Sequence, residues 1–231
     1  MDKVKDISKL IEGRPTEDIL RTLSELPSEK VVFSTSLSYE DQAITHMIFS
    51  DNLNIEVFTL DTGRIFQETY SVFNSTRDRY KKEIKTYYPK TDAVEKLVST
   101  KGPNSFYESV ENRKECCFIR KVEPLKRALS GKTIWITGIR AEQSTNRNEM
   151  KQVEWDETHQ LIKIHPILNW SFEETKAYIN KYNIPYNSLH DKGFVSIGCQ
   201  PCTRAIKAGE DFRAGRWWWE DTTKKECGLH T

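Results

Sequence analysis

The chain has 231 residues, and charged side chains make up 30% of them, yet the formal net charge is only +1. A chain of this length can bury a sizeable core as one large domain with extensions. The balanced charge argues against a nucleic-acid partner. No apolar run reaches transmembrane length, which argues against a membrane partner.

Residues 1–30 are polar, with one stripe of isoleucine and leucine at helical spacing, and we expect a helical N-terminal extension there. An α/β domain is then expected over residues 31–210. Regular periodicity fades after Tyr186, so an irregular and mobile C-terminal tail is predicted for residues 211–231.

Short buried strands alternate with helical patterns through the first half of the chain. Strands are expected at Val31–Phe33, Ile55–Leu60 and about Ile84–Tyr88, each followed by a helix. This alternation predicts a single doubly wound, mainly parallel sheet. The loops after the first two strands, Ser34–Ser38 and Asp61–Arg64, should lie at the carboxyl edge of that sheet and face one pocket.

The first of these loops supports two interpretations. Its four hydroxyl side chains lead into a helix N-terminus, whose free backbone N–H groups and dipole favour a phosphate group. The same composition is typical of a serine-rich turn that caps a helix. The Gly-Lys-Ser/Thr of a Walker A loop is missing.

The second half of the chain continues the alternation. A helix is expected over Glu115–Leu129, kinked or restarted at Pro124, which lacks a backbone N–H. A fourth strand at Thr133–Gly138 opens into a polar loop, and the last strand is expected at Leu161–Pro166. The capping box that starts at Ser171 begins a further helix, to which we give structural meaning only.

Cysteines carry the strongest signal of function. Cys116 and Cys117 form one pair, Cys199 and Cys202 a second, and Cys227 is left over. Four converging thiolates suit tetrahedral zinc or an iron–sulfur cluster. Neighbouring cysteines on a helix point about 100° apart, which is awkward for one metal ion and easier for a cluster with separate iron corners. We expect a cytoplasmic protein, because thiols stay reduced there.

Several cations and aromatic residues accompany the cysteines. Lys121 follows Cys117 by four residues, and so should share its helix face. Each cation is either solvated surface charge or part of an anion site; the arginines in question are Arg140, Arg147, Arg213 and Arg216. Three consecutive tryptophans, Trp217–Trp219, cannot all face one core. Four histidines without ligand spacing are interpreted as structural: His46, His159, His165 and His190.

The chain resembles the assimilatory adenylyl-sulfate (APS) reductases, the iron–sulfur branch of the APS/PAPS reductase family, over roughly Val31 to His230. The resemblance implies the adenine-nucleotide alpha-hydrolase-like fold, with a nucleotide-binding domain that carries the cluster. The motifs that carry it are Glu115-Cys116-Cys117, Gly138-Ile139-Arg140 through Arg147, Gly198-Cys199-Gln200-Pro201-Cys202-Thr203-Arg204, Gly215-Arg216-Trp217-Trp218-Trp219-Glu220 and Glu226-Cys227-Gly228-Leu229-His230.

The resemblance also implies roles for individual residues. Cys116, Cys117, Cys199 and Cys202 would hold a [4Fe–4S] cluster, and Cys227 would be the catalytic nucleophile. The implied substrate-binding residues are Ser34, Thr35, Ser36, Asp41, Leu60, Thr62, Arg64, Lys121, Gly138, Arg140, Arg147, Arg213, Arg216 and His230. Arg113 departs from the family, because some relatives have histidine there, and its role is open.

The chemistry implied is thioredoxin-dependent reduction of APS to sulfite and AMP, in sulfate assimilation and cysteine biosynthesis. Cys227 would attack the sulfur of APS and form a thiosulfonate. After the four ligands no second cysteine remains, so thioredoxin or a glutaredoxin-like dithiol donor would release sulfite. A monomer and a homo-oligomer are both left open.

Other functions fit parts of the sequence. PAPS reduction, or activity on both nucleotides, is the nearest alternative. A zinc-containing, ATP-activating sulfurtransferase would require a Ser-Gly-Gly-type loop, which Ser34–Ser38 does not provide. A four-cysteine zinc module that binds a partner through its tryptophans leaves Cys227 unexplained. A thiol oxidoreductase that uses Cys199 and Cys202 directly would place them near a βαβ unit, whereas here they lie in an irregular segment.

Overall fold

The computed structural model describes residues 2–143 and 149–220. The chain forms two compact units. The first consists of Met1–Thr59, Ser71–Lys85 and Gly131–Asn187, and the second of Leu60–Tyr70, Thr86–Ser130 and Ser188–Thr231. Each unit is therefore assembled from segments that are distant in the sequence.

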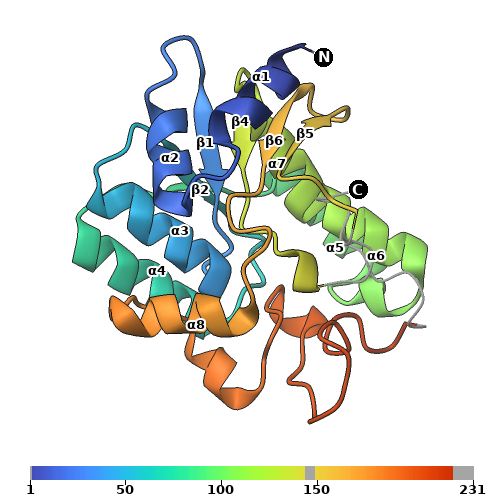
Figure 1. The fold of residues 1–231 in the computed structure, drawn as a ribbon. Coiled ribbons are helices and arrows are strands. Elements are labelled where there is room, and N and C mark those ends of the chain that lie inside the picture. Colours follow the sequence, from blue (N-terminus) through green and yellow to red (C-terminus); the bar gives the residue numbers. More distant parts are fainter. Residues whose placement is uncertain (1, 144–148, 221–231) are drawn as a thin grey trace. The chain divides into compact units, whose positions relative to one another are not determined.

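A six-stranded sheet carries the α/β architecture (Figure 1). Its strands are β1 (Val31–Ser34), β2 (Glu56–Leu60), β3 (Lys85–Tyr87), β4 (Ile134–Ile136), β5 (Val153–Asp156) and β6 (Leu161–Ile164). They lie in the order β3-β2-β1-β4-β6-β5. The pairs β1–β2, β1–β4 and β4–β6 are parallel, which confirms the prediction of a mainly parallel α/β sheet.

The sequence analysis missed the edge strand β5. It pairs antiparallel with β6, with Val153 opposite Ile164 and Asp156 opposite Leu161. The segment has only four residues and includes Glu154 and Asp156, which are uncommon in strands. A tight turn joins it to β6, in which Gln160 takes a positive φ of 55°. Pairing with its neighbour, rather than its own propensity, therefore makes this segment a strand.

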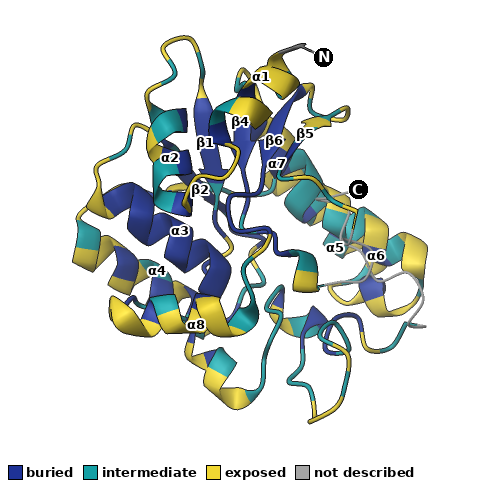
Figure 2. Ribbon diagram, viewed as in Figure 1, coloured by how far each residue is buried: buried dark blue, intermediate teal, exposed yellow. Residues whose placement is uncertain are grey.

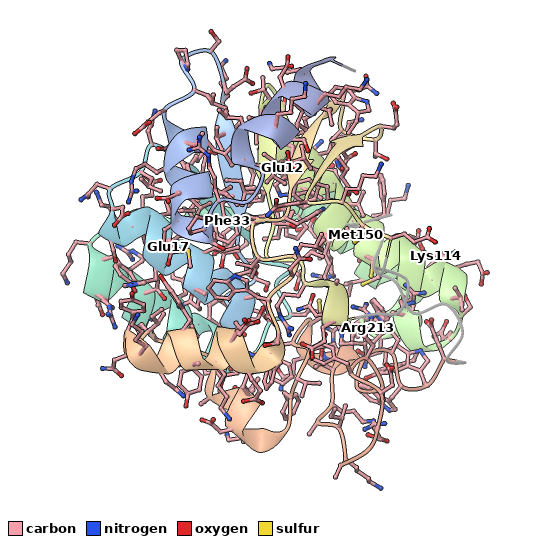
Figure 3. The ribbon with its side chains drawn as sticks, viewed as in Figure 1. Glu12, Glu17, Phe33, Lys114, Met150 and Arg213 are labelled. Atoms are coloured by element: carbon pink, nitrogen blue, oxygen red, sulfur yellow. The ribbon has the colours of Figure 1, made fainter. Side chains whose placement is uncertain are left out.

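The helices of the first unit bury one large apolar core and a smaller apolar cluster between two of them, α3 (Tyr39–Ser50) and α8 (Phe172–Lys181). The others are α1 (Asp2–Ile11), α2 (Thr16–Ser24) and most of α4 (Gln67–Tyr80). The two N-terminal helices contribute Ile11 and Leu20, while β1 contributes Phe33, which is fully buried and labelled in Figure 3. The predicted capping box is present at the start of α8, where Ser171 and Glu174 exchange hydrogen bonds.

Helix α3 is buried along almost its whole length, as its dark colour in Figure 2 shows. Tyr39, at its first turn, stacks on Tyr186 with ring centroids 5.1 Å apart and meets the edge of Phe172 at 5.9 Å. Because the helix is covered on every side, polar residues in its first turn are also buried, among them Glu40 and Asp41. These two carboxylates must therefore find partners inside the protein.

The second unit is built from short helices and turns. These are α5 (Thr91–Lys101), α6 (Val110–Cys117), α7 (Glu123–Leu129), the 3-10 turns Ser105–Tyr107, Ser188–Lys192 and Gln200–Cys202, and a π-helical turn, η2 (Phe118–Val122). The predicted helix over Glu115–Leu129 is helical throughout, because α6, η2 and α7 follow one another without a break, and Pro124 lies in the first turn of α7. Within the described ranges no helix has the length and apolar character required to cross a membrane.

Candidate active site

Four cysteines line a single small cavity in the second unit. Cys116 and Cys117 are the last two residues of α6, while Cys199 precedes the 3-10 turn Gln200–Cys202 and Cys202 ends it. None of the four forms a disulfide with another described cysteine. Two segments more than 80 residues apart in the sequence therefore bring their thiols to one place.

Local hydrogen bonds fix the second cysteine pair. The Thr62 hydroxyl lies 3.2 Å from the sulfur of Cys199, and the backbone N–H of Gln200 donates to the carbonyl of Arg64 at 2.8 Å. The N–H of Cys202 donates to the carbonyl of Cys199 at 2.9 Å, which closes the turn. The Cys-x-x-Cys segment is thus held by the loop that follows β2.

The thiols surround a space rather than a point. Among residues 2–143 and 149–220, no three cysteine, histidine, aspartate or glutamate side chains come together as ligands of a single metal ion. Several buried donors at the same place have no hydrogen-bond partner in the described chain, namely Nε of Arg120, Nε of Arg216 and Nε1 of Trp217. A group that offers several acceptor atoms to these donors, and bonds to separate thiolates, fits this set.

Nearby cations oppose the effect of burial on the pKa values of the cysteines, to a different extent at each thiol. Burial and the charge of Cys199 raise the pKa of Cys202 to about 12. Burial also raises the pKa of Cys116, although Arg120 opposes it. At Cys199 burial again favours the thiol, but Lys121, the Thr62 hydroxyl and other nearby cations outweigh it and lower the pKa. Lys121 and Arg120, from the π-helical turn, therefore favour a thiolate at Cys199.

Trp217 lies between two guanidinium groups. The centre of the Arg113 guanidinium is 4.7 Å from the ring centroid of Trp217, and that of Arg216 is 4.9 Å away. Trp217 is fully buried, whereas Trp218 is 40% exposed, as expected for tryptophans that cannot share one core. A side chain at Gly198 would place Cβ 2.3 Å from Nη2 of Arg216, so glycine is required there.

Arg113 is a functional candidate that the sequence analysis left open. It lies on α6, is only 4% exposed, and donates from Nε to Oε1 of Glu220 at 2.6 Å. Burial disfavours its charged form, yet Glu220 and Cys117 outweigh burial and raise the pKa of Arg113. Its guanidinium lines the cavity together with the four cysteines. No sequence pattern pointed to this pairing, since the partners are 107 residues apart.

The hydroxyl-rich loop of the first unit is organised around Asp41. The backbone N–H and the hydroxyl of Ser36 both donate to Oδ2 of Asp41, at 2.5 and 2.6 Å, and the N–H of Leu37 donates to the Thr35 hydroxyl. Burial raises the pKa of Asp41 to about 7, against the two Ser36 hydrogen bonds. A Cβ at Gly138 would lie 2.0 Å from Oδ1 of Asp41, so this glycine makes room for the carboxyl group.

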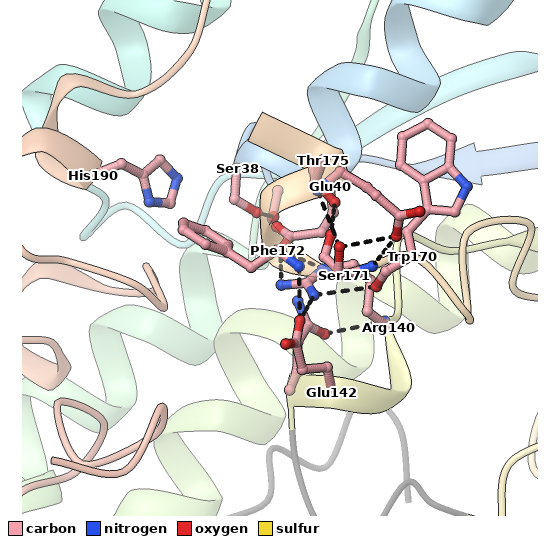
Figure 4. A network of polar contacts seen from close by, with 12 residues as sticks. Ser38, Glu40, Arg140, Glu142, Trp170, Ser171, Phe172, Thr175 and His190 are labelled. Atoms are coloured by element: carbon pink, nitrogen blue, oxygen red, sulfur yellow. Dashed lines mark hydrogen bonds and ion pairs between the residues drawn. The ribbon is translucent and has the colours of Figure 1, made fainter. Parts of the chain in front are cut away.

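Arg140 is engaged by other protein groups (Figure 4). Its Nε and Nη2 donate to Oε1 of Glu40 at 3.0 and 2.9 Å, and its Nη1 donates to Glu142 at 2.6 Å and to the carbonyl of Trp170 at 3.3 Å. Its side chain is fully buried, and that of Glu40 is 7% exposed. The arginine interpreted as an anion ligand therefore has a second role, which is to neutralise a buried carboxylate.

We expect Arg140→Ala to lower the free energy of unfolding by about 3–5 kcal/mol, because it leaves Glu40 charged, buried and unpaired. Urea denaturation measures the change. Arg21→Gln is the matched control, because Arg21 pairs with Asp18 and Asp51 at an exposed site, where ion pairs contribute little to stability. The double variant Glu40→Gln/Arg140→Met should recover much of the loss. Unchanged stability together with lost nucleotide binding would contradict this role.

The remaining predicted substrate residues are placed separately in the two units. Leu60 ends β2, and Arg64 donates to the carbonyl of Pro103 and to Asn104. Arg213 is half-buried in a turn where its carbonyl accepts from the N–H of Arg216 at 2.9 Å. Arg147, His230 and the predicted nucleophile Cys227 lie outside the described residues. One pocket shared by Ser34–Ser38 and Asp61–Arg64 stays a prediction.

Comparison with known proteins identifies the family. The model of the phosphoadenosine phosphosulfate reductase domain matches residues 30–205, which is more than half of the chain. The chain belongs to this family. The adenosine 5'-phosphosulfate reductase of Burkholderia cepacia is 50% identical over 202 residues, which cover 87% of this chain and 81% of the relative. That of Allochromatium vinosum is also 50% identical, over 87% of this chain and 79% of its own length.

A solved structure of the family supports the fold. The phosphoadenylyl-sulfate (PAPS) reductase of Candida auris, crystallised as a phosphate complex, superimposes with a TM-score of 0.76 at 27% sequence identity. The match covers 88% of this chain and 97% of that one. The α/β architecture of the family is therefore present here.

Proposed function

We propose that this protein reduces APS to sulfite and AMP in sulfate assimilation, through a covalent thiosulfonate on Cys227. The convergence of four cysteine thiols on one cavity carries the proposal, because it joins the two motifs on which the resemblance to APS reductases rests. The curated relatives at 50% identity, which are named adenosine 5'-phosphosulfate reductases, support the same activity. The reaction fits a cytoplasmic setting, where the thiols stay reduced.

The cavity suits a [4Fe–4S] cluster with Cys116, Cys117, Cys199 and Cys202 as its ligands. Thiolates bind iron at separate corners of such a cluster. The buried N–H donors of Arg120 and Trp217, which lack partners in the described chain, fit the sulfide acceptors of that group. When bound, the cluster supplies a rigid, charged group beside the cations that line the cavity.

Cys227 performs the covalent step in this proposal. Its thiolate attacks the sulfur of APS, a sulfur–sulfur bond forms, and the bond from that sulfur to the bridging oxygen breaks. AMP leaves with the electron pair, and Cys–S–SO3⁻ remains. Arg213, Arg216 and Lys121 are the candidates that neutralise the negative charge during attack. Ser34–Ser36, Asp41 and Gly138 are proposed to bind the nucleotide.

A protein dithiol completes the reaction. One of its thiolates attacks the sulfur of Cys227, sulfite leaves, and a mixed disulfide forms. Its second thiol then displaces Cys227, so that the donor becomes a disulfide and the enzyme thiolate is restored. The donor supplies the two electrons. Thioredoxin is the proposed donor, with a glutaredoxin-like protein as the alternative.

APS should be preferred over PAPS when both nucleotides compete for the holoenzyme. PAPS carries an additional 3′-phosphate, which requires further cationic groups, and Arg140 and Arg64 already pair with protein atoms. Sulfite release from each nucleotide, measured in mixtures of the two, tests this expectation. We expect at least a tenfold preference, equivalent to about 1.4 kcal/mol.

Reduction of PAPS, or of both nucleotides, is the second candidate. The family model and the solved structure from Candida auris are both named for PAPS, which favours this alternative. A clear preference for PAPS in the competition would select it and overturn the assignment to APS.

A further inference from the structure

Arg113 lines the cysteine-lined cavity and contacts two residues of the segment that contains the tryptophans. It lies on α6, three residues before Cys116, and its side chain is only 5% exposed. It forms an ion pair with Glu220 at 2.6 Å and stacks over the ring of Trp217 at 4.7 Å. The helix that carries one cysteine pair is therefore connected, through one guanidinium, to the segment that contains the tryptophans.

This segment leads directly into the part of the chain that carries Cys227. We call its last described residue, Glu220, the root of the Cys227 tail. Glu220 is the last residue that the structure describes, and Cys227 follows it by seven residues. The Glu220 side chain is only 10% exposed, and its backbone N–H donates to the carbonyl of Trp217 at 2.9 Å. A buried, charge-assisted hydrogen bond of this length is among the stronger polar contacts in proteins, so it fixes where the tail begins.

We propose that Arg113 is a positioning residue that clamps the root of the Cys227 tail to the helix of Cys116 and Cys117. This inference rests on the proposed function, because it assigns the clamp to the delivery of the Cys227 thiolate. Arg113 does not touch the reacting atoms. Arg113 instead fixes the position of Glu220, from which the chain extends to the Cys227 nucleophile.

The clamp has a geometric consequence. From Glu220, seven residues reach at most about 24 Å, which sets an upper limit on the distance between Glu220 and Cys227. Without the clamp, the next contacts are those of the Trp219 ring with Tyr107 and Phe106, at 4.4 and 6.1 Å between ring centroids, eight residues before Cys227. If effective concentration falls as the −3/2 power of tether length, this change alone lowers it by only about 20%. Loss of the direction that Trp217 and Glu220 impose lowers it further.

Limited trypsin digestion of the anaerobically purified holoenzyme tests the clamp directly. The peptide bond after Arg216 is protected, since Arg216 is 6% exposed and Trp217 is fully buried. We expect Arg113→Met and Glu220→Gln each to speed cleavage at this bond at least fivefold, while Arg113→Lys, which keeps the charge, should restore part of the protection. Mass spectrometry of the fragments identifies the site of cleavage.

Lys101→Gln provides the matched control. Lys101 forms an ion pair of the same length, 2.6 Å, with Glu115 on the same helix, but both side chains are 42% exposed. Its loss should leave cleavage after Arg216 unchanged. If Arg113→Met does not retain iron, Glu220→Gln, which keeps the shape of the side chain, decides the question. Wild-type protection in Glu220→Gln would overturn the inference.

A single-turnover measurement separates this inference from the proposed function. Formation of the Cys227 adduct from APS should slow at least twofold in Glu220→Gln, because the tether lengthens and the direction imposed at Glu220 is lost, with AMP affinity unchanged. A wild-type protein that forms no adduct would refute the proposed function, although cleavage after Arg216 would still test the clamp. An adduct that forms at the wild-type rate in Glu220→Gln would refute the positioning role alone.

Discussion

Cys227→Ser should bind nucleotide and retain its iron but release no sulfite. A serine hydroxyl is far less ionised than a thiol at neutral pH and cannot replace it as the nucleophile. We expect the rate of sulfite release to fall by a factor on the order of 10³ or more, as when an obligatory nucleophile is removed. Sulfite release with thioredoxin as donor, together with iron content and AMP binding, checks the three parts of this expectation.

The covalent intermediate can also be detected directly in the wild-type protein. Wild-type protein incubated with APS and no dithiol should gain about 80 Da, the mass of one SO3 group, on the peptide that contains Cys227. Thr223→Ser, in the same tail, serves as the control and should behave as wild type. An adduct on another cysteine, or turnover by Cys227→Ser, would show that the mechanism is wrong.

Cys199→Ser should lose bound iron and activity together. Nearby cations and the Thr62 hydroxyl lower the pKa of Cys199 against the effect of burial, which favours the thiolate that binds metal. Serine supplies a hard oxygen in place of the soft sulfur that iron in such clusters requires. Wild-type protein purified without oxygen should be brown, with about four iron and four sulfide per chain, and the variant should be colourless.

The two cysteine variants act as controls for each other. Cys227→Ser should stay brown and inactive, whereas Cys199→Ser should lose both colour and activity. Active wild-type protein that is colourless and contains stoichiometric zinc would remove the cluster from the proposal. It would favour a zinc-containing protein of the same fold instead.

The sequence was sufficient for features that depend on local pattern. Alternating strands and helices predicted the mainly parallel sheet, and Ser171 with Glu174 predicted the capping box of α8. Each of these patterns depends on residues that are close together in the sequence, so it can be recognised without the tertiary structure. The edge strand β5 offers only a short local signal, the alternation Val-Glu-Trp-Asp, which its two carboxylates weaken, so the strand is recognised from its pairing with β6.

Long-range pairings determine the parts of the candidate site that the sequence did not predict. Arg140 was interpreted as a surface charge or an anion ligand, yet it is buried against Glu40, which precedes it by 100 residues. Arg113 pairs with Glu220, which follows it by 107 residues. Composition and periodicity carry no information about which charges meet after folding, so only the structure reveals these pairs.

The π-helical turn at Phe118–Val122 has a consequence for how this region tolerates change. A residue inserted into or deleted from an α-helix rotates everything beyond it by about 100°, and here such a change would turn Lys121 and Arg120 away from the cysteines. Phe118 is 57% exposed, so its side chain can be exchanged freely. At Phe118, length is therefore constrained more tightly than identity, and alignments of this region should vary at this position but contain no gaps.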